Sequence, residues 1–556
     1  MKTTTELSAQ PPVEITEPRI GERETVASGL PAIVQTMRFG FGEMGAGRTL
    51  KTLTTMNQKS GFDCPSCAWP DPDDQRSPAE FCENGAKAVS DEATTARVSS
   101  EFFARYSLAE LSQQSDHWLG KQGRLTQPMV RKPGSYHYEV ITWDDAFTLI
   151  ADNLNKLSSP DEAVFYTSGR TSNEAAFLYQ LFVREFGTNN LPDCSNMCHE
   201  SSGVGLGETI GIGKGTVKLE DFRLADTIFV IGQNPGTNHP RMLTALQEAA
   251  RRGAKIISIN PLQETGLMRF KHPQEVWNLL GGGTAIASLF LPVRINGDVA
   301  LLKGIMKEML DADEQSGGKL LAHAFIAEHT VGFAEFADDL RQTSWEEIRD
   351  GSGVDREHIR EAARIALASE RMIVCWAMGL TQHKNGVANV QSVVNFCLVG
   401  GHIGRPGAGL CPVRGHSNVQ GDRTMGIYEK PSTEFLDALR TELGFEPPRH
   451  HGFDTVEAIH AMHGGGAKVF FALGGNFLSA TPDTEYTARA LQRCKLTVQV
   501  STKLNRAHLV TGETALILPC LGRTERDRQG ADEQFVTVED SMGVVHASRG
   551  GLEPAS

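Results

Sequence analysis

The sequence predicts a multidomain α/β protein built on parallel β-sheets. Short apolar runs typical of strands alternate with helical runs of about 10–15 residues, the order that produces parallel sheets with crossover helices. Two segments far apart in the chain repeat the same strand, turn, helix and strand. The chain has 556 residues, 40% hydrophobic and 22% charged, and at roughly 150 residues per domain it has room for three or four domains. This composition excludes a disordered chain and a coiled coil.

Charge and hydropathy narrow the classes of function. With 54 Lys and Arg against 68 Asp and Glu, the formal net charge is −14, which argues against a nucleic-acid partner. No apolar run reaches the roughly 18 residues of a transmembrane segment. The N-terminus has neither the apolar core of a secretory signal nor a twin arginine, so we expect a cytoplasmic protein. Because thiols stay reduced in the cytoplasm, its ten cysteines are interpreted as core residues, ligands or nucleophiles in preference to disulfide partners.

The N-terminal part of the chain precedes the alternating pattern. Residues 1–30 are polar and Pro-rich and are predicted to form a flexible arm. Residues 31–100 contain many Gly, Pro and Cys and show little periodicity, which predicts a small domain organised around a ligand. The run 80–113 is typical of a helix.

Strands and helices alternate through the rest of the chain. Helices are expected at 173–187 and at 239–253, the second with Gly253 as its C-cap. The expected strands are 162–169, 226–234, 254–260, 371–379 and 467–476.

The two repeated segments predict a pair of related ligand sites. In the first, a strand ends in Gly232-Gln233-Asn234 and the next strand ends near Asn260; in the second, a strand ends in Gly474-Gly475-Asn476 and the next ends near Ser501. Such strand ends, where Gly allows close backbone approach, are where α/β sheets bind nucleotides. The alternative is that two βαβ units merely resemble each other.

A first group of cysteines has metal-ligand spacing. Cys64 and Cys67 form a C-x2-C pair, and Cys82 follows fifteen residues later. Thiolates are the ligands that iron–sulfur clusters require. A zinc site with four thiolates is disfavoured because the chain has no second C-x2-C pair. A thioredoxin-like motif is disfavoured by the loop-like flanks.

A second group lies in the middle of the chain. Cys198 stands beside His199 and ahead of the Gly-rich run 201–215, which we expect to be a poorly structured stretch around a ligand. A Cys-His pair in such a setting is a candidate nucleophile or metal thiolate, although a lone Cys is more often a small core residue. Further along, Gly-, Arg- and Asn-rich segments at 404–409 and 412–421 favour anion contacts over a plain solvated loop.

These residues carry a resemblance to a known family. The chain is similar to the prokaryotic molybdopterin-containing oxidoreductases, within them to the formate dehydrogenase alpha-subunit-like, YdeP-type branch. The resemblance implies the α/β fold of domains 1–3 of formate dehydrogenase and DMSO reductase, lacking the C-terminal barrel domain. The matching stretches run in order from about residue 60 to the end: GFDCPSCAWPDP, FCENGAKAV, SGRTSNEAAFLYQLF, CSNMCHESSGVGL, FVIGQNPGTNHPRM, WAMGLTQHKNGVANV, GHIGRPGAGLCPVRGHSNVQGDRTMG and LPCLGRTERD.

The resemblance implies roles for individual residues. Cys198 resembles the thiolate ligand of molybdenum, His199 the active-site histidine, and Arg414 the arginine that anchors the formate carboxylate. Cys64, Cys67 and Cys82 resemble ligands of a [4Fe-4S] cluster, and Lys87 the lysine between cluster and pterin. The implied contacts of two molybdopterin guanine dinucleotides are Gly232, Asn234, Asn260, Gly475, Asn476 and Thr502.

The sequence departs from the family at two places. Asp71 stands where the family has a further cluster cysteine, so Asp71 or another group ligates the fourth iron, or the cluster is altered or absent. The chain also ends where the family continues into its barrel domain, which predicts a truncated product.

By analogy with the family, the two α/β domains are predicted to be interleaved. Residues 194–416 form an insertion between 101–193 and 417–525, after an iron–sulfur-type domain at 31–100 and before a terminal strand region at 526–556. The predicted reaction is oxidation of formate to CO2 at molybdenum, with electrons passed to the cluster and on to an acceptor protein or NAD-linked subunit. The alternatives are another small substrate and an inactive apo-protein with a stress-related binding role.

Overall fold

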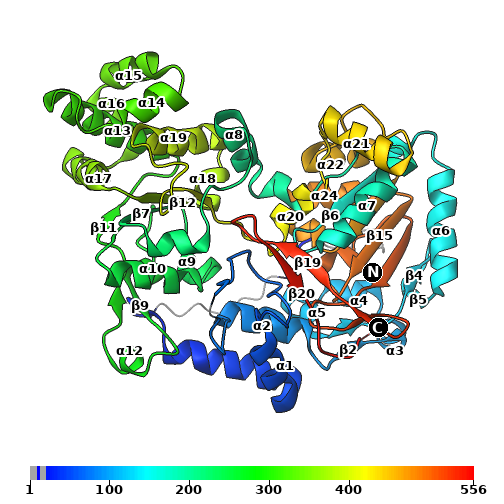
Figure 1. Cartoon of the computed structure of the whole chain (residues 1–556). Coiled ribbons are helices and arrows are strands. Elements are labelled where there is room, and N and C mark those ends of the chain that lie inside the picture. The colour runs from blue at the N-terminus through cyan, green and yellow to red at the C-terminus, as the bar shows by residue number, and fades with distance from the viewer. Residues whose placement is uncertain (1–8, 13–20, 75, 556) are drawn as a thin grey trace.

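The computed structural model describes residues 9–12, 21–74 and 76–555. Two α/β units with parallel sheets stand on opposite sides of the molecule, above the N-terminal helices α1 (Leu30–Thr55) and α2 (Glu83–Glu92) (Figure 1). This confirms the predicted fold class. Between the two units lies the C-terminal hairpin β19 (Val536–Glu539) and β20 (Val545–Ser548).

The first sheet is parallel throughout, and its strands all fall between residues 194 and 416. Its order is β11, β8, β7, β12, β13. All residues of β7 and β12 are buried because helices cover both faces, which explains their unbroken apolar sequences. The strands are β7 (Thr227–Ile231), β8 (Lys255–Ile259), β11 (Leu289–Leu291), β12 (Met372–Trp376) and β13 (Gly409–Pro412).

Alternate residues of these strands serve two cores. Phe229 and Trp376 face α13 and α19, whereas Ile228 and Ile373 face α10. The covering helices are α8 (Glu200–Ile210), α10 (Met242–Arg251), α13 (Asp298–Gln315), α17 (Arg356–Ala368) and α19 (Gly386–Val399). Further helices of this unit are α9 (Pro235–Asn238), α11 (Thr265–Met268), α12 (Val276–Leu280), α14 (His323–His329), α15 (Phe333–Gln342), α16 (Trp345–Ser352) and α18 (Met378–Thr381).

The second sheet combines segments from both ends of the chain. Its order is β5, β4, β16, β15, β14, β6, in which β6, β14, β15 and β16 are parallel and β4 and β5 antiparallel. The strands are β4 (Met129–Arg131), β5 (Glu139–Val140), β6 (Ala163–Thr167), β14 (Val469–Leu473), β15 (Leu496–Ser501) and β16 (Thr514–Pro519).

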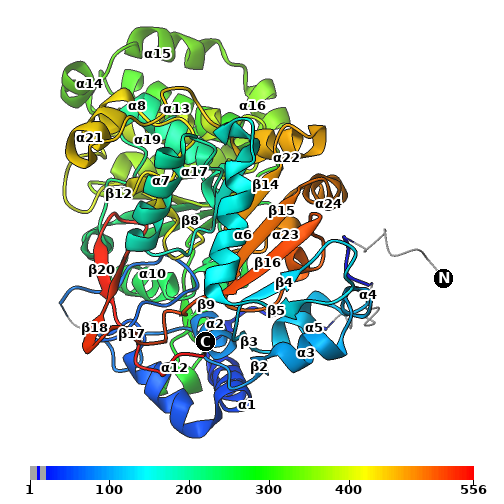
Figure 2. The same cartoon turned by 90° about the vertical axis from the view of Figure 1, so that its right-hand side faces the viewer.

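Helices cover both faces of this sheet as well. Figure 2 shows α6 and α7 lying over one face, where Ile150 and Val183 pack on Phe165. On the other face Met462 and Leu491 pack against Phe470. The helices are α6 (Trp143–Asn155), α7 (Asn173–Phe186), α20 (Val419–Thr424), α21 (Thr433–Leu443), α22 (Thr455–Gly464), α23 (Phe477–Ala480) and α24 (Thr484–Gln492).

The N-terminal region differs from the sequence-based expectation in two ways. It contains the long helix α1, whose periodicity is masked in the sequence by several glycines, one of which, Gly45, has φ +72° and kinks the helix. The single helix expected over 80–113 is broken: α2 ends at Glu92, and Arg97–Val98 (β2) pairs with Arg124–Leu125 (β3). The remainder forms α3 (Ser100–Arg105) and α4 (Leu108–Ser112), followed by α5 (Asp116–Lys121). β-Branched Val98 in a short polar run suits a strand, and this tertiary pairing overrides the local helical pattern.

Both ends of the chain attach to the body of the fold. Most of the predicted flexible arm, 1–8 and 13–20, lies outside the described residues. At its end β1 (Ala27–Ser28) pairs with β9 (Arg269–Lys271), beside β10 (Thr284–Ala285). After β16 the chain forms the hairpin β17 (Asp527–Gln529) and β18 (Asp532–Gln534), then β19 and β20.

A buried histidine makes the stability of this fold pH-dependent. Burial, with Arg405 adding to the effect and Asp226 opposing it, lowers the pKa of His402 to about 4, and the Arg405 guanidinium donates to its Nδ1 at 3.0 Å. The unfolded state therefore binds more protons than the folded state between about pH 4 and 6.5. The contribution of neutral His402 to the free energy of unfolding is complete above about pH 6.5 and is lost as the pH falls toward about 4.

We expect His402→Gln to flatten the pH dependence of stability. Between pH 7 and 4.5 the wild type should lose about 2–3 kcal/mol more unfolding free energy than the variant. Urea unfolding at the two pH values measures this difference. The exposed His451→Gln is the matched control and should follow the wild type. Equal losses in wild type and His402→Gln would contradict the prediction.

Candidate functional site

The two repeated segments lie at the carboxyl ends of central strands. β7 runs between β8 and β12, and β14 between β15 and β6. The turns that follow need positive φ angles, which Gly232 (φ +57°), Gly474 (φ +75°) and Gly475 (φ +84°) supply. Both turns thus begin with a positive-φ glycine, Gly232 or Gly474, at the edge of an α/β sheet where ligands bind, but the second turn has a further one, Gly475, where the first has Gln233.

The first turn is braced by the chain itself. A Cβ on Gly232 would lie 2.8 Å from the Cα of Gly379, whose N–H donates to the Gly232 carbonyl at 2.9 Å. Asn234 Oδ1 accepts from the Thr237 N–H at 3.2 Å and so caps α9, and Asn260 Nδ2 donates to the Gln233 carbonyl at 2.9 Å. Close approach of the α18 segment is therefore one reason for Gly232 that the sequence alone did not indicate.

At the second turn, two polar side-chain atoms lack a hydrogen-bond partner among the described residues. Asn505 Nδ2 donates to the Gly475 carbonyl at 3.1 Å, and the Thr502 carbonyl accepts from the Leu125 N–H at 3.0 Å. Asn476 Oδ1 and Ser501 Oγ are buried and lack a hydrogen-bond partner among the described residues. Buried polar atoms are normally paired, so these strand ends fit the polar groups of a bound dinucleotide.

Cys198 lies at the junction between a short 3₁₀ turn (Cys194–Met197) and α8. Asp193 caps that turn by accepting from the Asn196 N–H at 3.3 Å. The Cys198 thiol is 6% exposed and lies 3.5 Å from Met378 Sδ. Burial raises the pKa of Cys198 to about 11, although the positive charge of Arg414 and the hydrogen bond from the Gly415 N–H both act to lower it. A cationic neighbour of this kind favours the thiolate, which is the form that ligates metals.

Residues 201–210 of the Gly-rich run after Cys198 are helical, which corrects the expectation of a poorly structured stretch there, whereas 211–215 are not part of a helix. Residues Glu200–Ile210 form α8, and this helix packs on α19. The contact explains one glycine, because a Cβ on Gly205 would lie 3.0 Å from the Cβ of Val390. Gly205 therefore serves close helix packing, whereas a Cβ on Gly203 or Gly207 would meet nothing within 4 Å.

His199 takes part in a buried row of hydrogen bonds with Ser202 and Trp376. Its Nδ1 lies 2.9 Å from Ser202 Oγ, which accepts from Trp376 Nε1 at 3.0 Å. Because Ser202 receives the Trp376 hydrogen, its own hydrogen is available to Nδ1, and this favours the tautomer with hydrogen on Nε2. Burial, then Arg414, lowers the pKa of His199 well below its usual value, so the ring is neutral. Its Nε2 is buried without a partner in the described part of the chain.

Arg414 follows β13 and lies beside both residues. Its backbone N–H donates to Ser541 Oγ of the C-terminal hairpin loop, and Nη2 donates to the Gly213 carbonyl, both at 2.9 Å. The side chain is buried, and Nε has no partner within the described residues. The structure therefore brings Cys198, His199 and Arg414 together, with two unpaired N–H donors in the group.

Sequence reasoning missed several residues at this centre. Gln382 Nε2 donates to the Cys198 carbonyl at 3.1 Å, and Arg423 joins Asp193 and Glu200 at 2.8 and 2.6 Å. Asp422 is fully buried, and both carboxylate oxygens lack partners among the described residues. The available signal was their place in two stretches that resemble the family: Gln382 lies in WAMGLTQHKNGVANV, and Asp422 and Arg423 lie in GHIGRPGAGLCPVRGHSNVQGDRTMG.

The three N-terminal thiols line one cavity. A Cβ on Gly85 would lie 2.9 Å from Cys64 Sγ and 3.7 Å from Cys82 Sγ, and Cys67 lines the same space. Burial, then the neighbouring Cys67, raises the pKa of Cys82 to about 12, and burial also raises the pKa values of the other two. Three half-buried, converging thiols have the donor chemistry of an iron–sulfur cluster. Gly85 leaves room beside them.

Lys87 does not share this cavity. It lies on α2, five residues after Cys82, but its side chain is exposed and its ammonium lies 5.4 Å from the centre of the Phe39 ring. Asp71 does line the cavity, with Oδ1 2.6 Å from Arg241 Nη1.

Across the described residues, no helix combines the length and the apolar composition needed to cross a bilayer.

Comparisons with known proteins agree with this geometry. The profile of the family Molybdopterin oxidoreductase matches residues 124–515. The chain is 56% identical over 537 residues to an uncharacterized oxidoreductase of Mycobacterium tuberculosis H37Rv, covering 97% of this chain and 69% of the relative. It is 49% identical over 542 residues to protein YdeP of Escherichia coli K12, with 97% and 71% covered.

Two more distant likenesses extend the comparison. The alpha subunit of an F420-dependent formate dehydrogenase of Methanococcus maripaludis is 30% identical over 386 residues, covering 67% of this chain and 53% of the relative. The structure of acetylene hydratase from Pelobacter acetylenicus superposes with a TM-score of 0.60 at 19% identity, over 78% of this chain. The chain spans 59% of the acetylene hydratase chain, and this likeness concerns the fold alone.

Proposed function

We propose, from the premise that the chain belongs to the molybdopterin oxidoreductase family, that it oxidises formate to CO2. The reaction releases one proton and two electrons from each formate. In the proposal, Cys198 ligates molybdenum, and the metal is carried by two molybdopterin guanine dinucleotides. When bound, this cofactor supplies the two-electron redox chemistry that no protein side chain provides.

One observation carries the choice of formate. Among the described residues, His199 Nε2 and Arg414 Nε are buried without a hydrogen-bond partner, and the charge of Arg414 acts on both Cys198 and His199. A small carboxylate would accept hydrogen bonds from both, and burial strengthens such bonds because little water competes. Arg414 supplies the positive charge that holds the carboxylate, and neutral His199 donates a hydrogen bond without adding charge.

The remaining residues bind and position the cofactors. Cys64, Cys67 and Cys82 are proposed to hold an iron–sulfur cluster, and Lys87, on the Cys82 helix, to influence electron transfer through its charge. An acceptor protein or NAD-linked subunit would take the electrons. The proposed dinucleotide contacts are Gly232, Asn234, Asn260, Gly475, Asn476 and Thr502.

The test combines metal analysis with a formate assay. We expect the purified chain to contain molybdenum and iron and to reduce a viologen dye when formate is added. Cys198→Ser should lower this rate by at least about 10³-fold, because the hydroxyl is a poor metal ligand compared with a thiolate.

The control removes another buried thiol in the same way. Cys494→Ser changes a thiol buried in the core of the second α/β unit, where it donates to the Ala490 carbonyl at 3.8 Å, and it should keep the wild-type rate. An unchanged rate in Cys198→Ser would contradict the proposal. A metal-loaded wild type that ignores formate but reduces a dye with another small substrate would support the alternative substrate class. A chain without molybdenum would support the apo-protein.

A further inference from the structure

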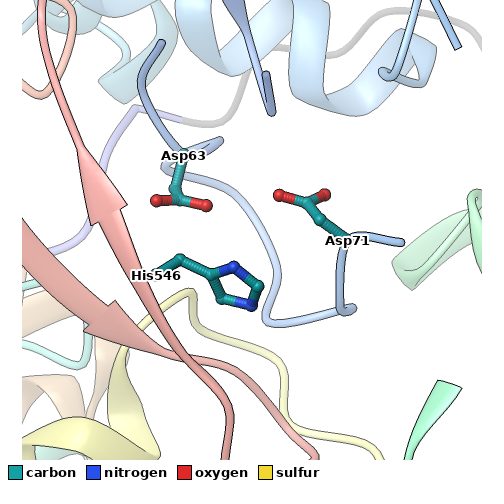
Figure 3. Close-up of side chains that lie close together, drawn as sticks. All are labelled: Asp63, Asp71 and His546. Atoms are coloured by element: carbon teal, nitrogen blue, oxygen red, sulfur yellow. The ribbon is translucent and has the colours of Figure 1, made fainter. Parts of the chain in front are cut away.

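Three residues from distant parts of the chain form a possible metal site beside the thiols. Asp63 and Asp71 come from the segment between α1 and α2, and His546 comes from β20 (Figure 3). One ligand atom from each lies within 4.8 Å of the others. We call these three residues the Asp-Asp-His triad. Imidazole nitrogen and carboxylate oxygen are both ligands found at non-haem iron.

The histidine of the triad is oriented as a metal ligand would be. His546 is 9% exposed, and its Nε2 lies 2.8 Å from Oδ2 of buried Asp540. Because a carboxylate only accepts, Nε2 carries the hydrogen, and in the neutral ring Nδ1 is left with the lone pair that binds metals. Figure 3 shows this nitrogen on the side of Asp63 and Asp71. Ligating histidines are typically fixed by a carboxylate on their other nitrogen in this way.

The carboxylates also point to a cation. Asp63 Oδ2 is buried and has no hydrogen-bond partner within the described residues. Asp71 is held by Arg241 at 2.6 Å and by Arg76 at 3.6 Å, which fixes its position. Arg241 and Arg76 compensate Asp71, whereas the buried Asp63 oxygen beside His546 Nδ1 has no hydrogen-bond partner in the described part of the chain. A positive charge at this point, supplied by a metal ion or by a proton, would satisfy Asp63 and Nδ1 together.

The triad and the thiols share one space. The cavity lined by Cys64, Cys67 and Cys82 is also lined by Asp63, Asp71 and His546. The hairpin that carries His546 is hydrogen-bonded to the thiol segment: the Asp63 N–H donates to Ser548 Oγ at 3.0 Å, and the Ser541 N–H donates to the Ala68 carbonyl at 2.9 Å. The position of His546 at the cavity is therefore built into the fold.

We propose that the Asp-Asp-His triad supplies the non-thiolate ligation of a four-iron cluster whose other irons are held by Cys64, Cys67 and Cys82. The inference rests on the cluster of the proposed function. A [4Fe-4S] cluster has four iron corners, and the described lining of the cavity includes three thiols. His546 binds the fourth iron through Nδ1 and displaces a water molecule from it, with Asp63 and Asp71 beside that iron. The step is ligand exchange, and no atom changes its oxidation state.

The experiment counts iron and identifies its ligand in the full chain. The protein is purified anaerobically with ¹⁵N-labelled histidine, and iron per chain is measured beside the pulsed EPR spectrum of the reduced cluster. We expect about four irons per chain and a ¹⁵N hyperfine coupling. In His546→Ala the coupling should vanish, and the count should fall to about three irons per chain.

A second variant keeps the test decisive if alanine prevents folding. His546→Cys restores a thiolate, so it should keep about four irons while losing the ¹⁵N coupling. His402→Gln, which changes a buried histidine of the first α/β unit, is the control and should keep both signals. Retention of the coupling in the His546 variants, or a wild type with about three irons or none, would overturn the inference. Formate oxidation is measured separately, by molybdenum content and dye reduction. A result that refutes the proposed role of the triad therefore does not refute the proposed reaction.

Discussion

Replacing Arg414 by alanine is expected to lower kcat/KM for formate by about 10³-fold. Loss of one buried charged partner of a carboxylate costs about 2–5 kcal/mol, and about 4 kcal/mol corresponds to this factor. Arg414 is buried beside Cys198 and His199, and its Nε has no partner among the described residues. Steady-state dye reduction over a range of formate concentrations measures the change, and we expect most of it in KM.

Two further variants separate binding from structure. Arg414→Lys keeps the charge but loses the planar fork, so it should recover only part of the lost kcat/KM. Arg364→Ala removes an exposed arginine that pairs with Glu361 on the same helix, and it should be neutral. The proposed role of Arg414 is wrong if Arg414→Ala keeps the wild-type KM and kcat.

The largest expected effect on stability comes from Arg124. Its guanidinium lies 2.8 Å from Glu525 Oε2, with the two side chains 1% and 0% exposed. It also donates to the carbonyls of Glu92, Cys520 and Thr502 at 2.9, 2.9 and 3.1 Å. Arg124→Met leaves the Glu525 carboxylate buried without its counter-charge and should lower the free energy of unfolding by about 3–5 kcal/mol. Urea unfolding followed by circular dichroism measures the loss.

The double variant tests the cause of this loss. Arg124→Met combined with Glu525→Leu removes the stranded charge, and we expect it to be more stable than Arg124→Met alone. The control is Lys132→Met at an exposed pair with Glu139, which should cost at most about 1 kcal/mol. A loss below about 1 kcal/mol in Arg124→Met would refute a structural role for the buried pair.

The sequence predicted the α/β class, the central strands and the turns that follow them. The expected strands at 226–234 and 467–476 contain β7 and β14, and both turns have positive-φ glycines. These features follow from local properties: apolar runs bounded by Gly mark buried strands, and Gly alone adopts such angles easily. The same local reasoning was wrong for α8, because tight packing of Gly205 on α19 makes a helix of a run that looks unstructured.

Only the tertiary structure decided which chemical groups meet. The sequence singled out Cys198, His199 and Arg414, but it did not show that His199 Nε2 and Arg414 Nε are left unpaired. It marked Asp71 as a departure from the family pattern and gave no sign that His546, 475 residues later, lies beside it. The physical reason is that the periodicity of strands and helices depends on residues close together in the sequence. Contacts between distant side chains depend on how whole elements pack, and no local pattern encodes that packing.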